Sequence, residues 1–179
     1  MEKLVLIDGH SILNRAFYGV PNLTNSEGLH TNAVYGFLNI LFKVLDEEKA
    51  DYLAVAFDLK APTFRHKMFD AYKGTRKPMP EELHEQVPLM KEVLTAMGVP
   101  ILTKEGYEAD DILGTIAKRE QKDGYEVTIL SGDRDLLQLS DTHIRICLPK
   151  TSRGTTEVHN YYPEDVIREY QVTPEQFIE

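Results

Sequence analysis

The chain has 179 residues, of which 42% are hydrophobic and 27% charged, values that are ordinary for a soluble globular domain with a core of its own. Its single cysteine, Cys147, excludes an intramolecular disulfide framework, and no apolar stretch approaches the roughly 20 residues that a membrane helix requires. The net charge of −9 argues mildly against nucleic acid as a partner.

Residues 3–8 form the first predicted strand, which starts too close to the N-terminus to leave room for a signal peptide, so we expect a cytoplasmic protein with no membrane partner. Further apolar runs of strand length follow at 52–58, 99–103, 126–130 and 143–148. Segments of helical periodicity separate several of these runs. This alternation predicts an α/β fold with a mainly parallel sheet.

Three helices are predicted between the strands. The first follows Thr31 and has one apolar face, formed by Val34, Phe37, Leu38, Leu41, Phe42 and Leu45. The second covers 81–97, with a kink or restart at Pro88 and an apolar side formed by Leu83, Val87, Met90, Leu94 and Met97. The third opens at Asp110 or Asp111 and ends near Gly124.

Two segments depart from this regular pattern. The link over 59–80 joins a strand to a helix, where about 2–6 residues are usual, and a connection this long is typically functional or disordered. It carries six basic residues and one acid between 60 and 77. The second segment, Thr173-Pro174-Glu175-Gln176, has the form of a capping box with proline at the first helical position, and too few residues follow to complete a helix. We therefore expect the chain to be part of a longer protein.

Acidic residues at the ends of the predicted strands are the most informative feature. Asp8 and Asp58 each close an apolar run, and two acidic groups follow at Glu108-Ala109-Asp110-Asp111 and Asp133-Arg134-Asp135. Turn or cap chemistry explains any one strand-end aspartate, but a cap needs only one acid of each group. Ligands of open α/β sheets bind beyond the carboxyl ends of the strands, so we expect these carboxylates to converge there.

Converging carboxylates indicate a divalent cation. They repel each other unless a cation joins them, and Mg²⁺ prefers such oxygen ligands. Two ions about 3.5–4 Å apart are suited to phosphate-ester hydrolysis. The sequence shows no Ser-His-Asp or Cys-His nucleophile set and no Gly-rich phosphate loop. A phosphatase with an aspartyl nucleophile remains an alternative because Asp8 ends the first strand, but such an enzyme wants another acid where this chain has His10.

The basic link supplies candidate phosphate contacts. Lys73 and Arg76 can face one phosphate if the segment turns helical, and positive charge there stabilises the transition state. Phe64, Phe69 and Tyr72 lie between the charges and suit base stacking. The alternative is a solvated loop with apolar anchors.

Three more residues are considered as phosphate contacts or metal ligands. Arg15 follows the first strand and is either a phosphate contact or an ordinary surface charge. His10 and His66 are expected to be bystanders rather than metal ligands, since the histidines lack zinc-type spacing.

Taken together, these motifs resemble a known family. The motifs are Leu6-Ile7-Asp8-Gly9, Phe57-Asp58, Tyr72-Lys73-Gly74-Thr75-Arg76, Gly106-Tyr107-Glu108-Ala109-Asp110-Asp111 and Ser131-Gly132-Asp133-Arg134-Asp135. In order and spacing they are similar to the 5′–3′ exonuclease domain of bacterial DNA polymerase I, which belongs with the flap endonucleases of the PIN-like, resolvase-like group. The resemblance covers nearly the whole chain and implies one three-layer domain over 1–179.

The resemblance implies a nuclease that uses Mg²⁺ or Mn²⁺, two ions in the intact parent, on DNA or RNA primers with a 5′ flap or free 5′ end. The implied metal-site residues are Asp8, Asp58, Glu108, Asp110, Asp111, Asp133 and Asp135. Lys73, Arg76 and Asp110 are implied to be catalytic, and 59–80 would be an arch over the 5′ strand. The implied nucleic-acid contacts are Arg15, Arg65, Lys67, Tyr72, Lys73, Arg76 and Lys77.

The family also has a helix-hairpin-helix region and a polymerase part beyond the end of this chain. Their absence leaves a different class of function open, a non-catalytic module that binds nucleic acid. The role expected for the parent is the processing of 5′ ends in replication and repair.

Overall fold

The computed structural model describes residues 1–179 except 60–62, 70, 72, 74–77, 153–154 and 178–179. In chain order the elements are β1 (Lys3–Asp8), α1 (Gly9–Gly19), α2 (Asn32–Glu48), β2 (Tyr52–Ala56), α3 (Phe64–Met68), α4 (Glu81–His84), α5 (Gln86–Ala96), β3 (Ile101–Leu102), α6 (Ala109–Lys122), β4 (Glu126–Leu130), η1 (Arg134–Leu139), β5 (Ile144–Ser152), β6 (Thr155–Tyr161), α7 (Pro163–Tyr170) and η2 (Pro174–Gln176), where η marks a 3₁₀ helix. No helix among the described residues is both long and apolar enough to cross a bilayer.

The strands form one sheet in the order β3-β2-β1-β4-β5-β6. Every neighbouring pair is parallel except β5 and β6, which are antiparallel. The prediction of an α/β fold with a mainly parallel sheet is therefore confirmed. The chain passes from β1 outward to β2 and β3 and then returns to β4 on the other side of β1. The boundary between β1 and β4 is thus the point where the strand order reverses, and ligands of such sheets bind at the carboxyl ends there.

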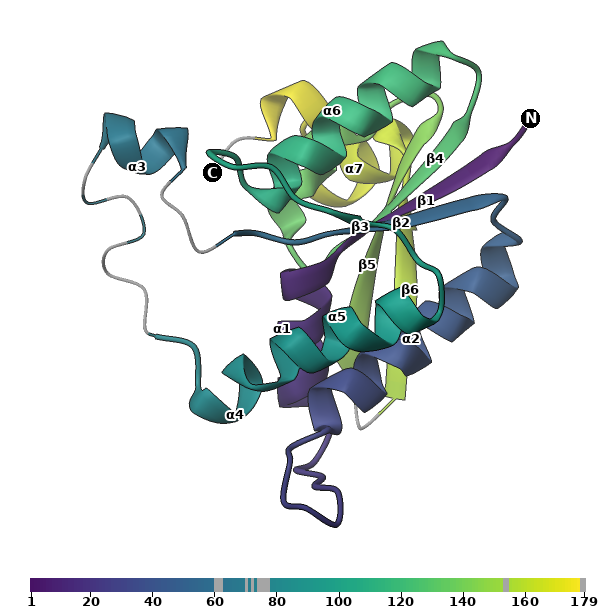
Figure 1. The fold of residues 1–179 in the computed structure, drawn as a ribbon. Helices are drawn as coiled ribbons and strands as arrows, with labels where there is room; N and C mark the ends of the chain where they lie inside the picture. Colours follow the sequence, from purple (N-terminus) through teal and green to yellow (C-terminus); the bar gives the residue numbers. More distant parts are fainter. Residues whose placement is uncertain (60–62, 70, 72, 74–77, 153–154, 178–179) are drawn as a thin grey trace.

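Helices cover both faces of the sheet and make three layers (Figure 1). Side chains of a strand alternate between faces, so Val5 and Ile7 of β1 join one core with α1, α2 and α5, whereas Leu6 joins the other core with α6 and α7. Both cores contain fully buried apolar side chains such as Phe37 and Leu113. The two cores hold β1 in the middle of the molecule, which fixes the position of its last residue.

Two side chains predicted to be buried are exposed. Phe42 on α2 is 52% exposed. The buried side of that helix runs through Phe37, Leu41 and Val44, and Phe42, which follows Leu41, points about 100° away from it. Met97 is 42% exposed because it follows the last residue of α5.

The predicted helix over 81–97 is divided into α4 and α5. The break falls at Glu85, ahead of Pro88. A proline ring clashes with the carbonyl four residues earlier, which here belongs to His84, the last residue of α4. The predicted restart is confirmed, but it lies one turn before the proline that causes it.

The first turn of α6 differs from the prediction. The helix begins at Ala109, and Glu108 rather than Asp110 or Asp111 is the N-cap. The cap is reciprocal, since the backbone N–H of Glu108 donates to Oδ2 of Asp111 at 3.0 Å. Asp110 is therefore not the N-cap, and among the described residues its Oδ1 accepts only the hydrogen bond from the Asp111 N–H at 3.0 Å.

Four elements were not predicted, namely α1, α3, β6 and α7. The omission of α1 matters most, because it follows β1 without a loop. Asp8 ends the strand and caps the helix, accepting a hydrogen bond from the Ser11 N–H at 3.4 Å. The next residue must be glycine, since a Cβ at Gly9 would lie 2.6 Å from the ring of Phe57. This close approach sets α1 against the end of β2.

Candidate functional site

Five carboxylates line one cavity of about 590 Å³ at the carboxyl ends of the strands. They come from the ends of β1, β2 and β4 and from the first turn of α6, and they are Asp8, Asp58, Glu108, Asp110 and Asp133. We call this the acidic cavity. The prediction that the strand-end acids converge is confirmed for these five residues.

Asp8 is the most buried of the aspartates in the cavity, with 8% of its surface exposed. Ser131 Oγ donates to its Oδ2 at 3.0 Å, across the boundary between β1 and β4. The pKa of Asp8 is raised to about 7, chiefly by burial; the hydrogen bonds from Ser131 and Ser11 oppose the rise, and the nearby charges of Asp58 and Asp110 add to it. A cation in the cavity would remove this penalty on the charged form.

Asp58 joins the end of β2 to the start of α6. Its Oδ1 accepts a hydrogen bond from the Ala109 N–H at 2.6 Å, one of the free N–H groups at the helix terminus. In the same turn, burial raises the pKa of Asp110, and the charges of Asp111 and Glu108 add to the rise. Burial and the close packing of acids at this terminus therefore disfavour the charged form of Asp110.

Two basic side chains reach the same turn from the basic link. Arg65 on α3 donates a hydrogen bond to Glu108 at 2.8 Å and donates to both carboxylate oxygens of Asp111 at 2.7 and 2.8 Å. Lys73 Nζ pairs with the other oxygen of Glu108. The bonds from Arg65 lower the pKa of Asp111 and raise that of the guanidinium. Lys73 has a left-handed backbone, with φ of 58°, a conformation uncommon outside glycine.

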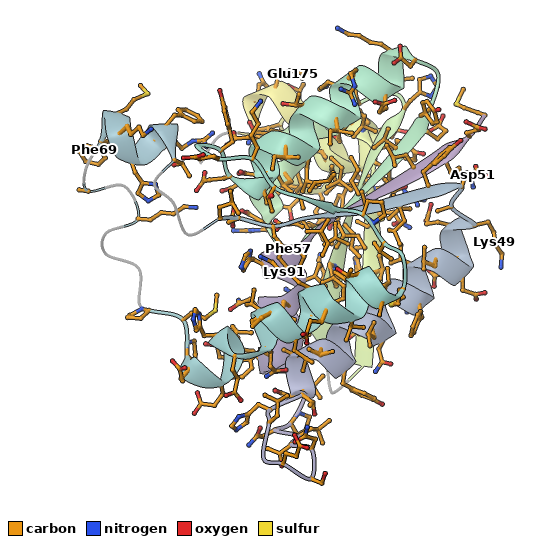
Figure 2. The ribbon with its side chains drawn as sticks, viewed as in Figure 1. Lys49, Asp51, Phe57, Phe69, Lys91 and Glu175 are labelled. Carbon is orange, nitrogen blue, oxygen red and sulfur yellow. The ribbon has the colours of Figure 1, made fainter. Side chains whose placement is uncertain are left out.

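Within the link, α3 lies away from the sheet (Figure 1). Figure 1 shows α3 beside the loop that leads into α6, and the Phe64 N–H donates to the Gly106 carbonyl at 2.8 Å. Phe69, at the outer end of α3, points away from the body (Figure 2) and is 65% exposed. The inner side of α3 is thus fixed by Arg65, while its outer side faces solvent.

These side chains are suited to hold divalent cations. Oxygens of Glu108, Asp110 and Asp111 all lie within 4.8 Å of one another. In the part of the chain that the structure describes, Asp8, Asp110 and Asp133 form no salt bridge. A cavity with several carboxylates, no neutralising partner for three of them and a raised pKa at Asp8 has the chemistry of an oxygen-ligand cation site.

Two of the predicted metal-site acids do not line the acidic cavity. Asp111 lines a neighbouring hollow with Arg65 and Gly114. Asp135 lies in the first turn of η1, where its N–H donates to Oδ1 of Asp133 at 2.9 Å. Each is still next to a residue that lines the cavity, since an Asp111 oxygen lies within 4.8 Å of those of Glu108 and Asp110, and the Asp135 backbone contacts Asp133.

The predicted nucleic-acid contacts are spread over several elements. Lys67 is exposed on α3, and Arg15 lies on α1 in a separate hollow beside Gly132. Tyr72, Arg76 and Lys77 lie outside the described residues, as does part of the 59–80 link.

Sequence reasoning missed the inner face of α1. Ser11, Asn14 and Tyr18 line the acidic cavity together with His10, a residue expected to be a bystander. The His10 Nδ1 accepts a hydrogen bond from the Asp58 N–H at 3.3 Å. Residues 11, 14 and 18 follow Asp8 at intervals of three or four residues, which is the spacing of one helical face. Helical periodicity could therefore have predicted that they lie on the same side as Asp8.

Asp8→Asn is expected to stabilise the metal-free chain at alkaline pH. The folded-state pKa of Asp8 is raised above its unfolded value, so folding takes up a proton, and the free energy of unfolding falls as the pH rises from about 4 to about 7. The variant lacks this loss and should gain about 4 kcal/mol at about pH 8 and little at about pH 4. Urea unfolding in EDTA at both pH values measures the gain, and an equal gain at both would contradict the assignment.

Comparisons with known proteins identify the family of the chain. Residues 3–171 match the family model described as "5′-3′ exonuclease, N-terminal resolvase-like domain". The chain is 49% identical over 178 residues to DNA polymerase I of Bacillus caldotenax, covering 99% of this chain and 20% of that protein. With DNA polymerase I of Mycobacterium leprae it shares 42% identity over 176 residues, 97% of this chain and 19% of that protein. The chain thus spans about a fifth of the length of these relatives.

A solved structure shares the fold. The phage T5 5′-exonuclease, solved with divalent zinc ions, matches 98% of this chain and 64% of its own with a TM-score of 0.72 and 24% identity. A T5 D15 flap endonuclease solved with DNA and metal ions gives the same TM-score of 0.72 at 23% identity, with 98% of this chain and 64% of that chain covered. At this identity the likeness concerns the fold, and the family rests on the model that matches residues 3–171. By that match the chain belongs to the 5′–3′ exonuclease family and carries its N-terminal resolvase-like domain.

Proposed function

We propose that this chain hydrolyses DNA phosphodiesters from 5′ ends or at 5′ flaps, as a nuclease dependent on Mg²⁺ or Mn²⁺. The observation that carries the proposal is the convergence of five carboxylates in one cavity beside Lys73. The products are a 5′-phosphate and a 3′-hydroxyl. RNA primers at 5′ ends are substrates of the same kind.

The acids divide into two groups by their surroundings. Asp8, Asp58, Asp110 and Asp133 line the cavity and would ligate the cations, whereas Glu108, Asp111 and Asp135 would act directly or through bound water. Divalent cations, when bound, neutralise these carboxylates and polarise the phosphodiester and a water molecule for in-line hydrolysis. Two cations would be held in the intact parent.

Basic residues are proposed to contact the DNA substrate. Lys73 lines the cavity and would contact the phosphate that is cleaved. Arg76 is proposed as a second catalytic charge. The 59–80 link would arch over the 5′ strand, with Lys67, Tyr72 and Lys77 as further DNA contacts. Arg65 is bound to Glu108 and Asp111, so we assign it first to the orientation of those acids.

The relatives are DNA polymerases I, and this chain corresponds to about a fifth of their length. We therefore propose the remainder of such a polymerase chain as its natural covalent partner, with a helix-hairpin-helix region that binds duplex DNA. The role proposed for that parent is removal of flaps and primers in replication and repair.

Cleavage of a labelled 5′-flap DNA in Mg²⁺ and in EDTA tests the proposal, with a small phosphomonoester as the comparison substrate. Metal-dependent cutting of the flap strand is the expected result. Turnover of the phosphomonoester alone would favour the aspartyl-nucleophile phosphatase, and a gel shift without cleavage in any divalent metal would favour a binding module.

A further inference from the structure

The acidic cavity has an apolar side that phosphodiester chemistry does not require. Tyr18, Pro78, Met79 and Pro80 line it together with the carboxylates. Tyr18 is 68% exposed and Met79 is 41% exposed, so large apolar surfaces face solvent next to a highly charged site. A ligand that carries both a phosphate and a flat apolar group would use both sides of this cavity.

Tyr18 also lines a second hollow along α1, which has a volume of about 380 Å³. That hollow includes Arg15 and Gly132, and Ser11 and Asn14 are common to both hollows. The Arg15 Nε is buried and has no hydrogen-bond partner among the described residues. The buried Nε is itself closed to a ligand, so what this hollow offers an anion such as phosphate is the positive charge of the Arg15 guanidinium.

The position of Tyr18 is fixed by its neighbour. The rings of Phe17 and Tyr18 meet edge to face with centroids 5.1 Å apart, and Phe17 packs against the core under α1 and α2. The exposed ring is therefore held between the carboxylates and Arg15, on the wall that Ser11, Asn14 and Tyr18 share between the two hollows. A chain that places one phosphate in the acidic cavity and another at Arg15 passes over this shared wall, where Tyr18 is the aromatic residue.

We propose that Tyr18 is a base-contact residue, on which one nucleobase stacks between a phosphate in the acidic cavity and a phosphate at Arg15. This inference rests on the proposed function and adds a nucleoside subsite to it. Met79 supplies the second apolar contact. Stacking on an aromatic ring tolerates any base, because every base has a π-face, so the subsite recognises the presence of a base and not its identity.

Binding of single-stranded DNA of about ten nucleotides tests the subsite. Fluorescence anisotropy in Ca²⁺ compares the wild-type chain with Tyr18→Ala, Tyr18→Phe and the control Tyr35→Ala, an equally simple truncation of a tyrosine that is 54% exposed on α2. A set of strands, each lacking one base at a successive position, locates the contact.

Tyr18→Ala is expected to bind the complete strand roughly tenfold more weakly, whereas Tyr18→Phe and Tyr35→Ala bind as the wild type does. The difference between wild type and Tyr18→Ala should vanish for the strand that lacks the stacked base, and for that strand only. Equal affinities of wild type and Tyr18→Ala, or a loss that is the same for every abasic strand, would overturn the subsite while leaving the nuclease proposal intact. A wild-type chain that neither binds nor cuts DNA would overturn both.

Discussion

Asp110→Ala is expected to abolish metal-dependent DNA cleavage, with a loss on the order of 10³-fold or more in kcat, while the fold is retained. Asp110 lines the acidic cavity, is not the N-cap of α6 and forms no salt bridge among the described residues, and its Oδ1 accepts one hydrogen bond, from the Asp111 N–H at 3.0 Å. Its pKa is raised by burial and by Asp111 and Glu108, so its removal also relieves repulsion within the first turn. Thermal unfolding should therefore show a Tm equal to or above that of the wild-type chain in EDTA.

The matched control is Asp123→Ala, which makes the same substitution in an exposed residue at the opposite end of α6. It should cut the flap substrate at the wild-type rate, because it removes a charge far from the cavity. A folded Asp110→Ala protein with wild-type rates would refute the role of this carboxylate.

Lys73→Ala is the second substitution with a large expected effect. Lys73 pairs with Glu108 and, unlike Arg65, lines the acidic cavity, so its charge would lie beside a phosphate bound there. Its loss should lower kcat about 10²-fold, since a positive charge at the reacting phosphate acts mainly in the transition state. The affinity for Mn²⁺ should not fall and should rise a few-fold, because removal of a cation leaves the carboxylates with more negative charge to neutralise.

Single-turnover cleavage and calorimetric Mn²⁺ titration measure the two effects separately. Lys122→Ala, an exposed lysine in the last turn of α6, serves as the control for loss of a positive charge. Weaker Mn²⁺ binding in Lys73→Ala would show that the lysine supports the metal site and not the substrate.

Much of the acidic cavity was predictable from the acids that follow the apolar runs of strand length. Apolar runs of strand length indicate parallel strands, and the residues that follow them, Asp8, Asp58 and Asp133, must then lie at one edge of the sheet. The inner face of α1 was missed for a local reason. Strand and helix are joined without a loop, so the change in periodicity at Gly9 carries no turn signal.

By itself the sequence determined the fold class, the strand-end positions of the acids and the anomalous basic link. Only the tertiary structure decided which acids share a cavity and which bind basic side chains. Ser131 reaches Asp8 across 123 residues because β4 pairs with β1, and Arg65 reaches Asp111 across 46 residues because α3 docks on the loop before α6. Both contacts depend on the order of strands and on the packing of distant segments, which are set by the burial of two whole cores and not by any local spacing of residues.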